Sequence, residues 1–239
     1  MDNLQWAYIG TVLVLFFIIF PLSIYIQFRV KKLFDQGSKI KSKLNVTGYQ
    51  MAKKMLNDHG IFDVNIKVGT YMQDNYNPTN NTVTLSEEVY NNSSITSLSV
   101  AAHEIGHVIQ YHKAFSLVRL RTRMLPLVKI CNFLIGPLFM IGIFLMFSQS
   151  FTAAYTFAAL GVFVFFGITV FHLITLPVEV DASRRALNYL KENNYLIGNE
   201  INISSKILRN ASYTYLMALV TSLAYFIMFI LRMLLLSRR

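Results

Sequence analysis

The feature that most constrains this chain is a five-residue stretch, His103-Glu104-Ile105-Gly106-His107. It is an H-E-x-x-H sequence, which on an α-helix places two imidazoles one turn apart on the same face. Both rings can then bind one Zn²⁺, and Glu104 can reach a water molecule on the same metal. The pattern is therefore typical of a zinc hydrolase, and in particular of a peptidase.

The residues around the motif predict that it lies inside a helix at about 94–111. Ser93 or Ser94 is a suitable N-cap, and no Pro or Gly follows until Gly106. Apolar residues recur at helical spacing along this segment: Ile95, Leu98, Ala102, Ile105 and Ile109. Because polar side chains are unusual on so apolar a helix, two ordinary histidines and a glutamate are the weaker interpretation.

A catalytic zinc site needs a third protein ligand, and several residues are candidates. A metzincin would carry its third His at the position of Lys113, so that class is excluded. His59 precedes Gly60 and is better explained as the last residue of a helix. His172 lies deep in an apolar run, where a polar residue is a functional candidate.

Glu179 is the strongest candidate for the third ligand. It follows Pro177, which suits the first turn of a helix, and the carboxylates of Glu179 and Asp181 would complement the dipole of that helix. This placement alone would explain both acids without a metal. A carboxylate at a helix start beside a membrane segment is also well placed to complete a His₂Glu site. Most of the support for Glu179 as a ligand comes from a resemblance to a known family.

Composition indicates a membrane protein, because 54% of the residues are hydrophobic and 14% are charged. A helix needs about 20 apolar residues to cross a hydrocarbon core of about 30 Å. Segments of this length lie at residues 7–28, 127–147, 153–176 and 213–231. The second and third spans would form a hairpin, which returns Glu179 to the side of the membrane that holds His103 and His107.

Positive charge predicts the orientation of these spans. Basic residues follow the first span, precede the second and follow the third: Arg29, Lys31, Lys32, Lys39, Lys41, Lys43, Arg119, Arg121, Arg123, Arg184, Arg185 and Lys191. The positive-inside rule then places both polar regions in the cytoplasm, although Arg238 and Arg239 oppose this arrangement. We expect a multi-pass protein of the cell membrane with its catalytic site on the cytoplasmic side.

The chain divides into five predicted parts. These are residues 1–28 as transmembrane helix 1, 29–126 as a zincin-like domain with the motif helix, 127–176 as the transmembrane hairpin, 177–212 as a third-ligand helical region that completes the domain, and 213–239 as transmembrane helix 4 and tail. Within the domain the patterns predict a helix at 47–57, a strand at 64–68, a loop at 69–81 and a strand at 82–85. An exposed edge strand just before the motif helix could hold an extended peptide.

Two stretches resemble the bacterial YugP-type membrane zinc metallopeptidases. They are AAHEIGHVIQ at residues 101–110 and PVEVDASRRA at residues 177–186, and residues 77–86 resemble the segment before the metal helix. The resemblance covers nearly the whole chain. It implies a zincin-like cytosolic domain and one zinc ion, with His103, His107 and Glu179 as metal ligands and Glu104 as the catalytic residue.

The chain differs from two broader groups of zinc proteases. The HtpX-like and prenyl-protease-like enzymes carry an acidic residue four positions after the ligand Glu. Ser183 stands at that place here, and the acid is Asp181 instead. A supporting role borrowed from those enzymes therefore does not transfer directly to Asp181.

These observations predict an α+β fold, namely a four-span α-helical membrane protein with a small zincin-like cytosolic metallopeptidase domain. The predicted function is peptide-bond hydrolysis by a zinc-activated water, with Glu104 as general base. A second oxyanion donor is expected, and the sequence leaves four candidates open: Arg184, Arg185, His172 and Tyr111. For the two arginines, pairing with Asp181 or contact with anionic lipid is the favoured role.

The expected partners are a peptide or membrane-protein substrate and membrane lipids, and the oligomeric state is left open. Nucleic acid is not expected, because the basic residues behind the net charge of +10 cluster at span ends. An intramembrane protease is disfavoured by Arg119–Arg123, which separate the motif helix from the next span. The remaining alternative is a non-enzymatic membrane scaffold or partner-binding protein with a zinc site.

Overall fold

A computed structural model describes residues 3–70, 73–145 and 150–238 of the chain. The chain folds into two units. The first, here called the span unit, comprises Met1–Tyr25, Leu120–Leu176 and Thr214–Arg239. The second, here called the site unit, comprises Ile26–Arg119 and Pro177–Tyr213.

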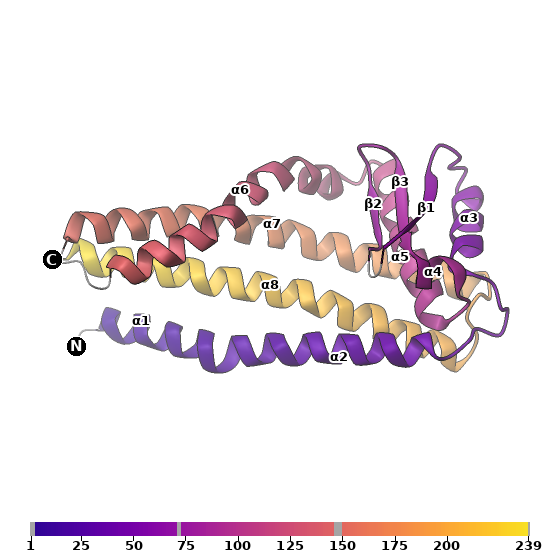
Figure 1. The fold of residues 1–239 in the computed structure, drawn as a ribbon, viewed down its shortest axis with the longest axis horizontal. Coiled ribbons are helices and arrows are strands. Elements are labelled where there is room, and N and C mark those ends of the chain that lie inside the picture. The colour runs from indigo at the N-terminus through magenta and orange to yellow at the C-terminus, as the bar shows by residue number, and fades with distance from the viewer. Residues whose placement is uncertain (1–2, 71–72, 146–149, 239) are drawn as a thin grey trace. The chain divides into compact units, whose positions relative to one another are not determined.

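The span unit is built from helices (Figure 1). It contains α1 (Asn3–Val14), the π-helical turn η1 (Leu15–Ile19), the beginning of α2 (Phe20–Ser38), most of α6 (Ser116–Leu145), the first part of α7 (Phe151–Glu192) and the end of α8 (Asn199–Ser237). Its buried core includes a group of stacked rings, in which Phe165 lies against Tyr225 and Phe229 with centroids 4.9 and 5.5 Å apart.

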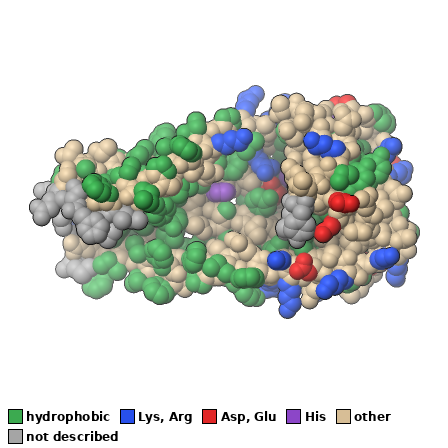
Figure 2. All heavy atoms as spheres, in the orientation of Figure 1, with side chains coloured by type: hydrophobic (Ala, Val, Ile, Leu, Met, Phe, Trp, Pro, Cys, Tyr) green, Lys and Arg blue, Asp and Glu red, His purple; other side chains and the backbone are tan. Residues whose placement is uncertain are grey.

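Four helical stretches in the described part of the chain are long and apolar enough to cross a membrane, and each contains or overlaps one predicted span. They are Asn3–Ser38, Ser116–Gly142, Phe151–Glu192 and Asn199–Ser237. The predicted end of the second span, at residues 146 and 147, lies outside the described residues. Large apolar side chains such as Phe17, Phe133 and Phe144 are exposed on these helices, and Figure 2 shows hydrophobic side chains over much of their surface. Such surfaces suit contact with lipid.

The site unit places a small sheet beside the motif helix. Its described strands are β1 (Asn65–Gly69), β2 (Asn75–Asn77) and β3 (Thr82–Ser86), in the order β1-β3-β2. β3 runs parallel to β1 and antiparallel to β2, with Ile66 and Tyr76 both opposite Val83. The short helix α4 (Glu87–Asn91) follows and leads to α5 (Ile95–His112), which carries the motif.

The sheet differs from the prediction in two respects. First, β2 lies within the segment predicted as a loop, because a strand of three residues is too short to show alternation in the sequence. Second, β3 was expected to offer an exposed edge, and this was wrong. All five of its residues are buried, and β3 is the central strand, so the edges of the described sheet belong to β1 and β2.

The helices of the site unit begin where their capping residues predict. Thr47 caps α3 (Gly48–Asp58) with a full capping box, since its side chain accepts from the Gln50 backbone and the Gln50 side chain accepts from the Thr47 backbone. Ser94 caps α5 by accepting from the backbone of Ser97, as one of the two predicted caps. The helices pack around one core of fully buried side chains: Met51, Met55, Leu85, Ile95, Leu98, Ile105 and Ile109.

The expected helix start at Pro177 is wrong. Helix α7 runs without interruption from Phe151 to Glu192, so Pro177 lies inside it. A proline within a helix loses its own N–H bond and clashes with the preceding turn, but apolar spans with good packing tolerate it. Here Val178, Ala182 and Ala186 are fully buried just beyond it. The dipole of a helix N-terminus therefore has no part in holding Glu179.

Candidate metal centre

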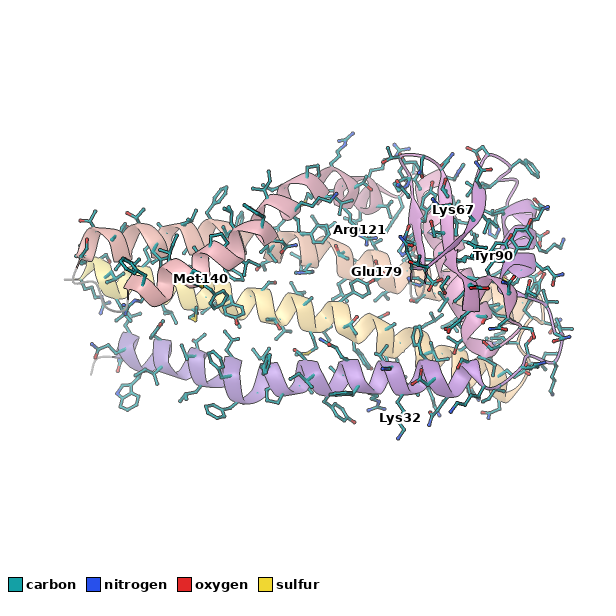
Figure 3. All side chains as sticks on the ribbon, in the orientation of Figure 1. Lys32, Lys67, Tyr90, Arg121, Met140 and Glu179 are labelled. Carbon is teal, nitrogen blue, oxygen red and sulfur yellow. The ribbon has the colours of Figure 1, made fainter. Side chains whose placement is uncertain are left out.

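Three of the predicted site residues come together in the described part of the site unit. His103, His107 and Glu179 each offer one ligand atom, and these atoms lie within 4.8 Å of one another. Glu179 Oε2 lies 3.3 Å from His103 Nε2 and 3.5 Å from His107 Nε2. Figure 3 labels Glu179 on α7, and the two histidines lie on α5.

The local sequence explains why these atoms meet. His103 and His107 are four residues apart on α5, so their rings lie on one face, with centroids 4.8 Å apart. Gly106 lies between them in sequence, and a Cβ atom there would lie 2.8 Å from the carbonyl oxygen of Ala182 on α7. The absence of a side chain at Gly106 thus lets α7 approach α5 closely enough to bring Glu179 to both rings.

The outer nitrogen of each imidazole also has a partner. Nδ1 of His107 lies 3.0 Å from Oε1 of Gln110, and Nδ1 of His103 lies 3.2 Å from Oγ of Ser183. Both Nε2 atoms are therefore directed toward Glu179. Metal-binding histidines usually hold a hydrogen-bond partner on the ring nitrogen away from the metal.

The donor set fits a zinc ion. Two imidazole nitrogens and one carboxylate oxygen are the ligands of a His₂Glu catalytic site, which keeps a fourth position open. Glu179 is 1% exposed, and this burial opposes its charge. The two imidazoles close to the Glu179 carboxyl outweigh burial and hold its pKa well below its usual range. Glu179 is thus an ionised carboxylate among groups that favour a cation.

Glu104 lies between the two histidines in sequence, on the same helix. Its residue is 8% exposed, so the carboxyl is largely withdrawn from bulk water. A carboxylate at this position has the chemistry of a general base for a water molecule bound next to the imidazoles. The structure thus places a candidate base and a candidate metal-binding triad in the same unit.

Asp181 is held by charged partners, as predicted. Arg184 and Arg185 both donate to its carboxylate, the latter from Nε at 2.6 Å, and Gln110 Nε2 donates to it at 2.9 Å. Burial opposes ionisation, but the hydrogen bonds from Gln110 and the two arginines outweigh it and lower the pKa of the Asp181 carboxyl. The predicted pairing of both arginines with Asp181 is thus confirmed.

The other candidates lie outside the triad. His59 is the C-cap of α3 and its Nδ1 lies 2.8 Å from the Met55 carbonyl oxygen, which confirms its explanation as a helix-end histidine. The ring of Tyr111 packs edge-on against Tyr76 of β2, with centroids 6.1 Å apart. His172 belongs to the span unit, where its buried Nδ1 has no hydrogen-bond partner among the described residues.

A separate polar hollow of about 680 Å³ lies between α3 and α7. Lys54, Asp58, Arg185 and Tyr189 are among the residues that line it. Lys54 forms an ion pair with Asp58, and the Tyr189 hydroxyl donates to the same carboxylate. None of the three triad residues lines this hollow, so it is not part of the candidate metal centre.

Gln110 and Ser183 were not predicted as partners of the imidazoles. A signal for Gln110 was present in the sequence, because a glutamine on the apolar side of a helix, three residues after His107, needs hydrogen-bond partners when buried. Ser183 stands where broader protease groups carry an acid, and the structure shows that its hydroxyl meets His103.

Comparison with known proteins places the chain in a family. Residues 12–234 match the family described as "Putative neutral zinc metallopeptidase". The chain belongs to this family. One relative is the "Putative membrane protease YugP" of Bacillus subtilis (strain 168), which is 34% identical over 211 residues, or 88% of this chain and 91% of the relative. No solved structure matches the chain. The predicted resemblance to the YugP-type family is thus confirmed, and zinc is the metal that the family description names.

Proposed function

We propose that this chain is a membrane-anchored zinc metallopeptidase in which His103, His107 and Glu179 hold one Zn²⁺ and Glu104 is the general base. The observation that carries the proposal is the convergence of three ligand atoms within 4.8 Å, from two helices that are far apart in sequence. The family description and the membrane-protease name of the relative support it independently.

A bound zinc ion supplies a Lewis acid and lowers the pKa of its water toward about 7. The residues of the chain do the remaining work. Glu104 takes a proton from the attacking water and later gives it to the leaving amine. The lowered pKa of Glu179 means that its carboxyl stays ionised, so it provides a negatively charged ligand for the metal.

The proposed substrate is a peptide segment bound in extended form next to α5. β2 is an edge strand of the described sheet, and its Tyr76 contacts Tyr111 of α5 through their rings. The outer edge of β2 in the described sheet is therefore a suitable place for main-chain hydrogen bonds to a peptide. We further propose that the site unit is a zincin-like domain and lies in the cytoplasm, since basic residues predominate beside the spans.

The deciding experiment uses the full-length protein, purified in detergent, with the substitution Glu104→Gln. Glutamine keeps the size of the side chain but cannot accept a proton as a carboxylate does. We expect the variant to keep one zinc ion per chain and to lose cleavage of an unstructured polypeptide by about 10²–10⁴-fold. The matched control is Glu87→Gln, which removes an exposed carboxylate on α4 and should cleave like the wild type.

Two outcomes would contradict the proposal in different ways. Undiminished cleavage by Glu104→Gln would place the general base elsewhere. A wild-type protein that binds zinc but cleaves no polypeptide, and a cell phenotype that Glu104→Gln leaves unchanged, would favour the alternative of a scaffold with a zinc site.

A further inference from the structure

The side chain of Gln110 is fully buried and makes three hydrogen bonds, which together fix its orientation. Its Nε2 lies 2.8 Å from the carbonyl oxygen of Val178 and 2.9 Å from Oδ2 of Asp181. Both partners are acceptors, because one is a backbone carbonyl and the other is a carboxylate paired with two arginines. The amide nitrogen must therefore face them, and Oε1 must face His107.

This orientation decides where a neutral His107 carries its single ring proton. Oε1 of Gln110 is an acceptor and lies 3.0 Å from Nδ1, so a hydrogen bond forms here only when Nδ1 carries the proton. A competing acceptor lies on the other side of the ring, since Oε2 of Glu179 is 3.5 Å from Nε2. The contact to Gln110 is the shorter of the two.

The competition matters because the two tautomers differ in their capacity for a metal. With the proton on Nδ1, the lone pair of Nε2 faces Glu179 and is open to a cation. With the proton on Nε2, the imidazole donates to Glu179, and two of the three ligands pair with each other instead. A neutral imidazole can bind a metal only through the nitrogen that carries no proton.

We propose that Gln110 is a positioning residue, locked by Asp181 and Val178, that holds the His107 proton on Nδ1 and so keeps Nε2 free for the metal. The inference rests on the proposed function for the identity of the metal. Asp181 acts through Gln110, and the contacts of Arg184 and Arg185 with its carboxylate hold it in place as an acceptor. The acid two positions after Glu179 therefore supports His107 on the opposite helix.

The arrangement around His103 shows why Gln110 is distinctive. Nδ1 of His103 faces the hydroxyl of Ser183, which can donate or accept. Either tautomer of His103 can form this hydrogen bond, so Ser183 does not determine which ring nitrogen carries the proton. Gln110 is thus the residue that sets the tautomer of one ligand in this pair.

The test compares wild type with Gln110→Met, which keeps length and removes all three hydrogen bonds. Zinc affinity is measured by chelator competition on the full-length protein in detergent. We expect the dissociation constant for zinc to rise by about 10–100-fold, which is the usual effect of removing a hydrogen-bond partner of a metal-binding side chain. Asp181→Asn is the second variant. An asparagine amide can donate a hydrogen bond to Oε1 of Gln110, so the orientation of the Gln110 amide is no longer fixed. This variant should also weaken zinc binding.

The matched control is Glu200→Gln. Glu200 is another buried carboxylate of the site unit, and it accepts from the backbone N–H groups of Lys43 and Ile197. Its loss should lower thermal stability and leave zinc affinity unchanged. This control separates a general effect of removing a buried charge from a specific effect on the site.

A spectroscopic measurement tests the tautomer without zinc and without activity. The chain has five histidines, so ¹⁵N-histidine labelling gives a simple nitrogen spectrum, in which His107 is assigned by its loss in His107→Ala. At a pH of about 9, where an ordinary imidazole with a pKa of about 6.5 is neutral, metal-free wild type should show protonated Nδ1 at His107. Gln110→Met should move that proton to Nε2.

An unchanged tautomer and unchanged zinc affinity in Gln110→Met, with only a lower melting temperature, would reduce Gln110 to a packing role and overturn the inference. Protonated Nε2 at His107 in the wild type would overturn it as well. Failure of the proposed function appears differently, as a wild type that shows the expected tautomer but has no affinity for zinc or no peptidase activity.

Discussion

Gly106 of α5 faces Ala182 of α7 so closely that a Cβ atom on the glycine would lie 2.8 Å from the alanine carbonyl oxygen. The atom in the way belongs to the backbone, which cannot move aside as the end of a flexible side chain can. The glycine within the H-E-x-x-H motif therefore sets the distance between the two helices that carry His103, His107 and Glu179.

The substitution Gly106→Ala should weaken the site. Alanine favours a helix over glycine by about 1 kcal/mol, but overpacking costs about 1–3 kcal/mol and here moves Glu179 away from the rings. We expect zinc affinity to fall by at least about tenfold, since metal sites depend on ligand geometry. The measurement is chelator competition on purified protein. Gly136→Ala, at a helical glycine of α6 with open space around it, is the control and should bind zinc normally.

The triad itself is tested by three alanine variants. His103→Ala, His107→Ala and Glu179→Ala should each lower zinc content sharply, because three protein ligands are the usual minimum of a catalytic zinc site. Zinc per chain is measured by atomic spectroscopy after dialysis. His112→Ala and Glu192→Ala remove an exposed histidine at the end of α5 and an exposed carboxylate of α7, and both should retain the metal. Full zinc content in Glu179→Ala would reopen the search at Asp181 and His172.

Much of this arrangement could be predicted because it depends on local chemistry. The N-caps Ser94 and Thr47 lie where a side-chain oxygen precedes an apolar helical pattern, and the structure has both helices there. The four spans follow from the length of apolar runs alone. The spacing of His103 and His107 fixes their common face on any helix.

The remaining features depend on contacts between segments far apart in the chain. The sheet order puts β3 in the centre because β2 pairs with it from within a polar loop, and three residues leave no periodic signal. Pro177 predicts a helix start by its own properties, but buried packing of the residues after it keeps α7 continuous. The role of Gln110 depends on Val178 and Asp181, which are 68 and 71 positions away.

The orientation of the spans gives a prediction that is independent of the metal. If the positive-inside rule holds, Lys41 and Arg121 face the cytoplasm and Ser150 faces outside. Single cysteines at these positions, in a Cys131→Ser background, are treated in intact cells with a reagent that does not cross membranes. Labelling is expected at position 150 and not at 41 or 121. Labelling at position 41 would show that the protein has the opposite orientation in the membrane.

The contact between Ser183 and His103 predicts a smaller effect than the one expected at Gln110. The Ser183 hydroxyl lies 3.2 Å from Nδ1 of His103, and its replacement in Ser183→Ala leaves that nitrogen without this partner. An unsatisfied buried group costs about 1–3 kcal/mol, but a hydroxyl does not select one tautomer, so Nε2 of His103 is not driven toward Glu179. We expect zinc affinity to fall by no more than about tenfold. This is the lower end of the range for the loss of a hydrogen-bond partner of a metal-binding side chain.

The control for this variant is Ser204→Ala, which removes a buried hydroxyl that bonds Ser99 elsewhere on α5. It should lower the melting temperature by a similar amount and leave zinc affinity as in the wild type. A loss of zinc affinity in Ser183→Ala that equals or exceeds the loss in Gln110→Met would contradict this ranking. Such a result would show that Ser183 and Gln110 support zinc binding by giving Nδ1 of each histidine a hydrogen-bond partner, and not by selecting a tautomer.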